Sequence, residues 1–309
     1  MRRPSGELPW TDEETRGLKS HADVIAALRS RVEQGTATPD EQERFTTAVF
    51  ALDKAVKDKE RPVGDVIVCV DKEGKEVLFD LAEIRRQWVQ FYDTHGLSEI
   101  LKDKQGHDTL PADIKLTPEQ VDIIKEKAKE GFTRMVLVPA GIEQHLEELK
   151  INLTDGLEKD DNNNPIPTYL SDNVKPSFPN QITTTDPRRL GKAYLLMTNP
   201  DAALYPGTKG QSADEIIRTF ADPAVNVSGL TLADFLIEER QHFDETGQHL
   251  VDWGKNEWTW FLSSRDAAAR VLHAGWDPNY RRVKVNSSSP EDRYPGLGAR
   301  SSVVLALES

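Results

Sequence analysis

A polar, aromatic stretch followed by an apolar strand constrains this chain more than any other feature. Residues 301–307 read Ser-Ser-Val-Val-Leu-Ala-Leu and predict a strand tied into a sheet, because Val and Leu fit a pleated, half-buried surface. Residues 276–294, just before it, mix Trp and Tyr with Arg, Asn and Ser. Rigid aromatic side chains beside short polar ones are typical of binding loops. The pattern therefore indicates a binding function more than a catalytic one.

Composition narrows the class of protein. With 309 residues and 37% hydrophobic content, the chain predicts two or three modules rather than a single core. The formal charge of −13 disfavours binding to nucleic acid or to an anionic membrane. No window approaches 18 apolar residues and no signal-peptide run is present, so we expect no membrane insertion and a cytoplasmic location. The single cysteine, Cys69, precludes an intrachain disulfide and fits a reducing compartment.

Three helix starts share one capping pattern. Thr11, Thr38 and Thr117 are each followed three residues later by Glu or Gln, the pattern of a capping box. The first two predict helices over 12–34 and 39–60 that form a helical hairpin, which we assign to residues 1–62.

Two further domains follow. Residues 63–131 predict a small α/β unit with a β-hairpin over 65–79 and helices over 81–94 and 118–130. Residues 132–309 form the third domain. Its predicted elements are strands over 135–138, 192–198, 258–262, 281–285 and 301–307, helices over 142–152, 212–221 and 231–246, and an irregular stretch over 154–190. The predicted fold class is α+β.

Residues 230–247 contain the only candidate metal ligands on a predicted helix. Glu239 and His242 have the Glu-x-x-His spacing of carboxylate-bridged metal sites, Glu238 lies four residues before His242, and His249 follows the helix. No second Glu-x-x-His occurs, so a solvated acidic helix face is the favoured interpretation. A metal-dependent or unrecognised enzyme using Glu239, His242 and His249 is kept as the alternative function.

Other catalytic and cofactor signals are weak. The run Asp160 to Asn164 offers oxygen ligands that suit Ca²⁺, but it lacks the glycine and glutamate of an EF-hand, and a polar loop is favoured. Ser301 and Ser302 lack a nucleophile elbow, Cys69 lies within a predicted strand, and residues 207–210 lack the spacing of a phosphate loop. We expect no catalytic residues, no resident metal and no cofactor.

Tryptophans gather near the C-terminal end. In a strand Trp258 and Trp260 point to the same face, and Trp258 is interpreted as one wall of the core. Arg300, two residues after Gly298, is interpreted as a buried structural arginine forked onto carbonyl groups.

Three ordered motifs resemble one superfamily. Met135 to Gly141 (MVLVPAG) resembles the "v-x-v-P-a-G" opening of formylglycine-generating-enzyme-like domains, Gly254 to Trp260 (GKNEWTW) resembles their "G-N-v-W-E-W" motif, and Gly298-Ala299-Arg300 resembles their "G-f-R". The resemblance implies a C-type-lectin-like domain over 132–309. Catalytic members need a cysteine pair near the C-terminus, which this sequence lacks, so their activity is not implied.

The variable proteins of diversity-generating retroelements use the same fold without the cysteine pair, and this chain resembles them. Their C-terminal stretch is rewritten at adenine positions of a template and displayed for ligand binding. The resemblance implies a non-enzymatic binding protein, with a protein as its partner, that binds through residues 258–294. An inert scaffold assembled by the N-terminal helices is a third interpretation. The expected ligand-binding residues are Trp260, Ser263, Arg265, Trp276, Asn279, Tyr280, Arg281, Asn286, Ser288, Arg293 and Tyr294.

Overall fold

The computed structural model describes residues 28, 31–32, 36–48, 66–201, 203–222, 225–251 and 257–307. The chain divides into two compact units, Met1–Val66 and Ile67–Ser309. In the first, residues 39–48 are helical, and the Thr38 capping box forms: the amide of Thr38 donates to the Glu41 carboxylate at 2.8 Å and the amide of Glu41 donates to the Thr38 hydroxyl at 3.3 Å. The start at Thr11 and most of the helical hairpin lie outside the described residues.

The second unit begins with a β-hairpin and two helices, as predicted. Strands β1 (Val66–Val70) and β2 (Glu76–Asp80) pair, and helix α3 (Leu81–Thr94) follows with the Asp80 side chain as its cap. A short 3₁₀ turn, η1 (Ser98–Leu101), precedes α4 (Pro118–Lys129), which starts at the predicted Thr117 capping box. The indole of Trp88 in α3 donates to the carbonyl of Met135 at 2.9 Å. Residues 67–131 therefore bond directly to the part of the chain that follows, and the domain boundaries stay predictions.

A four-stranded sheet holds the first and last strands of the predicted third domain. Its order is β3 (Arg134–Val138), β6 (Tyr194–Thr198), β12 (Ser301–Ala306) and β7 (Ser228–Gly229). The three strand pairings in this sheet are antiparallel. Strand β6 is buried along its whole length, which fits its apolar sequence up to Thr198. The prediction that 135–138 and 303–307 share a sheet is confirmed, with β6 between them.

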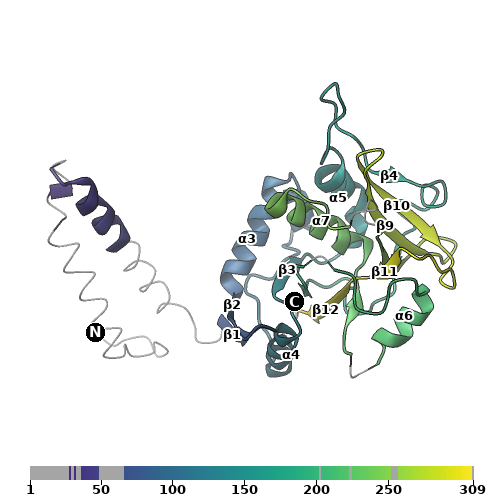
Figure 1. The fold of residues 1–309 in the computed structure, drawn as a ribbon, viewed down its shortest axis with the longest axis horizontal. Coiled ribbons are helices and arrows are strands. Elements are labelled where there is room, and N and C mark those ends of the chain that lie inside the picture. The colour runs from purple at the N-terminus through teal and green to yellow at the C-terminus, as the bar shows by residue number, and fades with distance from the viewer. Residues whose placement is uncertain are drawn as a thin grey trace. The chain divides into compact units, whose positions relative to one another are not determined.

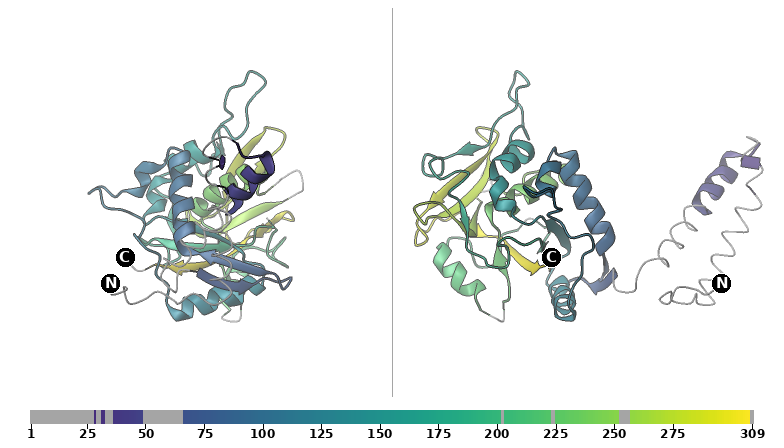
Figure 2. Two further views of the ribbon diagram at one scale, coloured as in Figure 1. Left: turned by 90° about the vertical axis from the view of Figure 1, so that its left-hand side faces the viewer. Right: turned by 180° about the vertical axis from the view of Figure 1, so that it is seen from behind.

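The second sheet carries the C-terminal polar stretch. Its order is β11 (Leu297–Ala299), β8 (Trp258–Arg265), β9 (Val271–Asp277), β10 (Arg282–Ser288) and β4 (Tyr169–Leu170), and β5 (Thr183–Thr184) also pairs with β8. Figure 1 shows these strands at the right-hand side of the unit, away from α3, and Figure 2 shows the same separation from behind. Strand β9 was not predicted, and β4 and β5 anchor the irregular stretch 154–190 to this sheet.

Helices fill the space between and around the two sheets. The predicted helix over 142–152 consists of three successive kinds of turn: η2 (Ile142–His145), α5 (Leu146–Leu149) and the π-helical η3 (Lys150–Thr154). Helix α6 (Ala213–Phe220) starts at a capping box on Ser212, and α7 (Leu232–Thr246) starts at one on Thr231. The fold is mixed α+β, as predicted. Among the described residues, no helix has the length and apolar character needed to cross a membrane.

A buried ion pair and a nearby hydrogen bond tie the start of α7 to the two sheets. Arg189 is fully buried, and its guanidinium lies 3.0 Å from the carboxylate of Asp234 in the first turn of α7. The same guanidinium contacts Asp186 and donates to the carbonyl of Gly229 in β7 at 3.0 Å. In the same first turn of α7, the amide of Leu232 donates to the hydroxyl of Ser264 in β8 at 2.9 Å. The helix start is therefore held by groups from both sheets.

We expect Arg189→Leu to lower the free energy of unfolding by about 3 to 5 kcal/mol, because it leaves the carboxylates of Asp186 and Asp234 buried without their cation. Arg188→Leu is the matched control, since the Arg188 side chain is 43% exposed and contributes an ion pair from the surface. Urea unfolding followed by circular dichroism measures both. Equal losses of unfolding free energy in the two variants would show that the buried ion pair of Arg189 does not contribute more to stability than the surface ion pair of Arg188.

Candidate ligand-binding face

Strand β10 separates its side chains between two faces. Arg282, Lys284 and Asn286 are half-buried, whereas Val283 and Val285 between them are buried. This alternation follows from the two-residue period of a strand. The register brings further groups onto the outer face, because Lys284 lies opposite Gly275 and Asn286 lies opposite His273 in β9. The polar stretch therefore has one side in the core and one side on the surface.

Gly275 makes room on this face for Trp258. A Cβ atom at Gly275 would lie 3.2 Å from the carbonyl oxygen of Glu257 and 3.4 Å from the indole of Trp258. The missing side chain lets β8 and the half-buried indole approach β9 closely. The indole meets the ring of His273 edge-on, with 5.4 Å between centroids. The glycine thus places an aromatic ring over the middle of the sheet.

Beside Trp258 the face is hollowed. The hollow has a volume of about 340 Å³ and is lined by Trp258, His273, Lys284, Asn286, Ser288, Tyr294, Pro295, Gly296 and Leu297. We use the term sheet face for the lining side chains on β8, β9 and β10 and their surface neighbours, namely Tyr169, Trp258, His273, Tyr280, Arg282, Lys284, Asn286, Ser288 and Tyr294. An apolar hollow with a few fixed polar groups is the usual form of a binding site.

Hydrogen bonds fix the polar groups of the hollow. The imidazole Nε2 of His273 lies 3.1 Å from the Ser288 hydroxyl. The side-chain oxygen of Asn286 accepts from the hydroxyl of Ser171 at 2.7 Å and from the amide of Ser287 at 2.9 Å. Burial, with a smaller contribution from the charge of Lys284, lowers the pKa of His273 to about 3. His273 is therefore neutral at physiological pH, and the floor of the hollow is rigid and uncharged.

The expected ligand-binding residues divide into three groups. Exposed side chains are Asn279, Tyr280, Arg281, Arg293 and Tyr294, and half-buried ones are Arg265 and Asn286. Trp260, Ser263, Trp276 and Ser288 are buried, and only Ser288 among them lines the hollow. A ligand-binding role for the exposed and hollow-lining members stays a prediction.

The two expected tryptophan contacts need correction. Trp260 is fully buried, and its indole donates to the carbonyl of Gln211 at 3.3 Å, so the chain before α6 covers it. Trp276 has the opposite parity to His273 on β9, which turns it to the inner face, where its ring stacks on His249 at 3.5 Å between centroids. Trp258, interpreted as core, is instead the tryptophan that lines the hollow.

Ser263 and Arg265 also lie away from the hollow. Both are at the far end of β8, where its register with β9 shifts between Phe261 and Arg265. The Arg265 guanidinium donates to the carbonyl of Leu262 at 2.7 Å, so its hydrogen bonds stabilise this irregular strand end. A contact between these two residues and a ligand in the hollow is not supported by their positions.

Five residues of the sheet face were absent from the sequence-based set of ligand-binding residues: Tyr169, Trp258, His273, Arg282 and Lys284. The alternation of Arg282, Lys284, Asn286 and Ser288 with Val283 and Val285 was a usable signal, because it marks one face of a strand. The predicted ligand-binding arginine, Arg281, is one residue before the arginine that lies on the sheet face, Arg282. Arg281 has a φ of 49° and belongs to the turn, where it pairs with Glu158 at 2.9 Å. Tyr169 comes from a distant segment and had no local signal.

Two of the candidate metal ligands, Glu239 and His249, are hydrogen-bonded to each other. The Nδ1 atom of His249 lies 2.6 Å from a Glu239 carboxylate oxygen, and the other oxygen accepts from the amide of Leu250 at 2.9 Å. These contacts tie the end of α7 to the chain leading into β8. Within the described ranges, no group of three or more His, Cys, Asp or Glu is placed to hold a metal ion. The helix face is also buried at Glu238, Glu239 and His242, so the expectation of a solvated acidic face is wrong.

The acidic run at 160–164 forms a tight turn. Asp160 accepts hydrogen bonds from the amides of Asn162 and Asn164 at 2.9 and 2.8 Å and from the Asn164 side chain at 3.0 Å. Asn163 adopts a φ of 65°, a conformation that asparagine tolerates. These bonds account for the composition of the run as turn chemistry. Calcium binding there stays the less favoured alternative.

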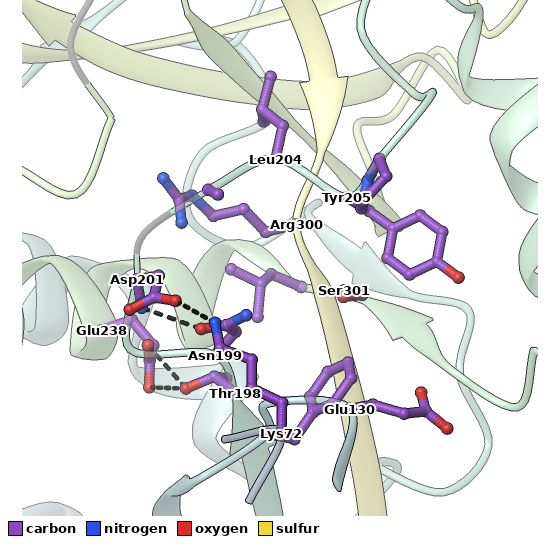
Figure 3. Close-up of a pocket in the computed structure, with 14 residues that line it drawn as sticks. Lys72, Glu130, Thr198, Asn199, Asp201, Leu204, Tyr205, Glu238, Arg300 and Ser301 are labelled. Atoms are coloured by element: carbon purple, nitrogen blue, oxygen red, sulfur yellow. Dashed lines mark hydrogen bonds and ion pairs between the residues drawn. The ribbon is translucent and has the colours of Figure 1, made fainter. Parts of the chain in front are cut away.

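A second cavity, of about 490 Å³, lies between the β1–β2 turn, the end of β6, α7 and β12. Figure 3 shows Glu238 and Thr198 on one side of it and Arg300 on another. Both Glu238 oxygens accept from the Thr198 hydroxyl at 3.1 Å, and burial raises the pKa of Glu238 to about 7 despite the nearby Arg134. Arg300 is buried and donates to the carbonyl of Leu250, consistent with the structural role assigned to it. This cavity offers one carboxyl group that titrates near neutrality.

The Gly-Ala-Arg motif has a packing explanation. A Cβ atom at Gly298 would lie 2.9 Å from Leu204 and 3.3 Å from the Cα of Lys209, so only glycine lets the chain before α6 lie against β11. That contact carries two backbone hydrogen bonds, from Tyr205 to Ala299 at 2.7 Å and from Gly210 to Leu297 at 2.8 Å. The motif thus lets the chain before α6, which covers Trp260, pack against the edge strand β11.

Comparison with known proteins gives no relative. No protein-family model matches the chain, and searches of curated proteins and of solved structures return no match. The function must therefore be inferred from the fold and the site alone.

We expect the stability of the protein to fall below pH 6.5 because of His273. A folded-state pKa of about 3 lies below the ordinary value, so the stabilisation is fully present above about 6.5 and is lost as pH falls toward 3. At pH 5 the loss amounts to about 2 kcal/mol. His273→Gln cannot titrate, so its stability should change by that much less between pH 7 and 5. His107→Gln, at an exposed position, is the control. Identical pH profiles for wild type and His273→Gln would contradict a buried, neutral imidazole.

Proposed function

We propose that this protein is a non-enzymatic ligand-binding protein that holds a protein partner on the sheet face. The observation that carries the proposal is the combination of exposed Tyr280 and Tyr294 with a hollow lined by Trp258, all on one side of a sheet whose other side is core. Aromatic side chains around a concave site supply most of the energy of typical interfaces. Tyr280 is 62% exposed and Tyr294 is 47% exposed, so their rings are available to a partner.

The proposed framework is a C-type-lectin-like domain that resembles the variable proteins of diversity-generating retroelements. Three features support this reading. The strand with the opening motif and the terminal strand share a sheet, the Gly-Ala-Arg motif closes the edge of the second sheet, and the polar stretch is displayed on that second sheet. The residues of the framework and the displayed residues of the polar stretch lie in different places. A protein that tolerates variation at its surface requires this separation.

The alternative enzyme has less support. The three residues expected to form its site do not line a common cavity. Glu239 and His249 are hydrogen-bonded to each other, and His242 lines neither the hollow nor the cavity of Figure 3. Glu238 in that cavity has a pKa suited to acid–base chemistry, but its oxygens are occupied by Thr198. We therefore retain binding as the function.

We expect a photo-crosslinking amino acid at position 280 or 294 to capture the same protein partner from lysate of cells that carry the gene. The same amino acid at Ile151 or Leu190, which are 50% and 53% exposed and do not line the hollow, is the matched control and should capture nothing specific. Mass spectrometry of the adducts is the measurement. Equal adducts at all four positions, or none at 280 and 294, would argue against the sheet face as the binding site.

We expect the DNA next to the gene to encode a reverse transcriptase and to contain a near-copy of the codons for residues 265–300. In that copy, adenines should fall at codons for exposed residues such as Asn279 and Tyr280 and should be absent from codons for buried framework residues such as Val283 and Val285. Sequencing the locus is the measurement. A locus without such a copy would remove the retroelement part of the proposal and leave the binding part intact.

A further inference from the structure

A third cavity lies away from the sheet face. It has a volume of about 940 Å³, and residues from three segments of the chain line it: 102–109, 140–148 and 179–191. The second segment holds η2 and the start of α5, and the third holds β5. None of the sheet-face residues is among those that line it. We call it the Glu143 cavity, after an acidic side chain in its wall.

The carboxyl group of Glu143 has an oxygen without a partner. Its Oε1 atom is shielded from solvent and makes no hydrogen bond to the rest of the described chain. The hydroxyl oxygen of Thr184, which lines the same cavity, is likewise buried without a hydrogen bond. Buried polar atoms are nearly always hydrogen-bonded, so two such atoms in one cavity wall indicate a site for a polar ligand. The terminal torsion of a glutamate has no sharp preferred state, so a small rotation turns Oε1 toward the cavity.

No cation of the described chain forms an ion pair with Glu143. The guanidinium of Arg189 is near enough to affect the carboxyl group, but it is already paired with Asp186 and Asp234. Burial raises the pKa of Glu143 to about 7; a hydrogen bond from its own amide and the charge of Arg189 oppose this rise, and the charge of Asp234 adds to it. A buried carboxylate without a counter-ion is costly. An ionised Glu143 is therefore stabilised by a cation placed in the cavity.

The lining of the cavity indicates an organic cation. The formal charge of −13 on the whole chain attracts cations in general. A metal ion takes several protein ligands, whereas an ammonium group has three N–H donors and can be held by one carboxylate with neutral acceptors beside it. Gln105, Gln144 and Asn180 line the cavity and supply amide oxygens as such acceptors. Ile182 and Leu190 supply carbon surface that suits an alkyl chain.

We propose that the Glu143 cavity binds a small aliphatic amine in its ammonium form, with the ammonium group on the Glu143 carboxylate and the alkyl chain against Ile182 and Leu190. The ligand supplies the counter-ion that the described chain does not give this carboxylate. A volume of about 940 Å³ takes a whole small molecule and exceeds what one side chain of a partner would fill. The site is independent of the proposed function, because it shares no lining residue with the sheet face.

Isothermal titration calorimetry of the full chain with pentylamine tests the proposal. The titration is carried out at pH 8 in an amine-free buffer of low ionic strength, where Glu143 is ionised and the amine is protonated. As controls, 1-pentanol has the same length and no charge, and pentanoate has the opposite charge. We expect saturable binding of pentylamine with a Kd of about 1 mM or below, and binding at least about tenfold weaker for both controls.

Two glutamine variants assign the contact. Glu143→Gln keeps the shape of the side chain and removes its charge, so pentylamine should bind about tenfold more weakly. Because the carboxylate has no counter-ion in the free protein, this variant should melt at pH 8 at the same temperature as the wild type or higher. The matched control Glu148→Gln removes the charge of an acidic side chain that lines the same cavity but is 55% exposed. It should change the affinity less than about twofold.

The affinity for pentylamine should rise about tenfold between pH 6 and pH 8. A pKa of about 7 means that Glu143 is mostly protonated at pH 6 and mostly ionised at pH 8, whereas an aliphatic ammonium group stays charged at both. Tyr194, whose charge would affect Glu143, stays neutral because burial raises its pKa well above its ordinary value. Histidine side chains also change charge near neutral pH, so His145→Gln is the control and should keep the rise. The other charged residues that line the cavity are Lys102, Asp103, Lys104 and Glu148.

Equal affinity for pentylamine and 1-pentanol would overturn the proposal. Equal effects of the two glutamine variants, the same affinity at pH 6 and pH 8, or no saturable binding of pentylamine up to about 10 mM would overturn it as well. A lower melting temperature of Glu143→Gln at pH 8 would contradict it too, because it would show that a partner within the protein stabilises the carboxylate. Tighter binding of Nα-acetyl-lysine N-methylamide than of pentylamine would overturn the assignment to a free amine and favour a lysine side chain of a peptide. The crosslinks at positions 280 and 294 test the sheet face separately.

Discussion

The buried ion pair between Arg189 and Asp234 is the contact on which the two-sheet arrangement depends. A charge removed from water is costly unless it is paired and hydrogen-bonded, and Arg189 meets this requirement only where Asp234, Asp186 and the carbonyl of Gly229 come together. These partners belong to α7, to the irregular stretch and to β7. Forming the pair therefore brings together segments that are far apart in the sequence, and it places α7 where Ser264 of the second sheet can cap it.

The candidate site depends on strand register in the second sheet. Because side chains alternate along β10, a shift of one residue would bury Arg282 and Lys284 and expose Val283 and Val285, which burial of the apolar residues opposes. Pairing with β9 then sets His273 beside Asn286 and leaves space over Gly275 for Trp258. The same interactions that stabilise the sheet thus assemble the hollow. This explains why a rigid polar floor lies directly beneath exposed aromatic rings.

Four arginines of this protein illustrate how the partners of an arginine decide its role. Arg189 is structural because carboxylates and carbonyls surround it in the core. Arg281 and Arg293 are exposed, yet each pairs with a carboxylate, Glu158 from a loop and Glu215 from the first turn of α6. Arg282 rests on the rings of Tyr169 and Tyr280, which position the guanidinium on the sheet face. Residue type and exposure alone do not distinguish these roles.

The sequence by itself determined the elements with strong local signals. Capping boxes at Thr38 and Thr117 and the apolar strands at 135–138 and 301–307 are read from neighbouring residues, because caps and alternation are local effects. Only the tertiary structure decided which aromatic residue faces outward. Trp258 and Trp260 share a strand face, but the chain before α6 covers Trp260, whereas Trp258 is half-buried and lines the hollow. Tyr169 joins the sheet face from a segment over a hundred residues away from Arg282. Burial at these positions depends on long-range packing, which no local pattern encodes.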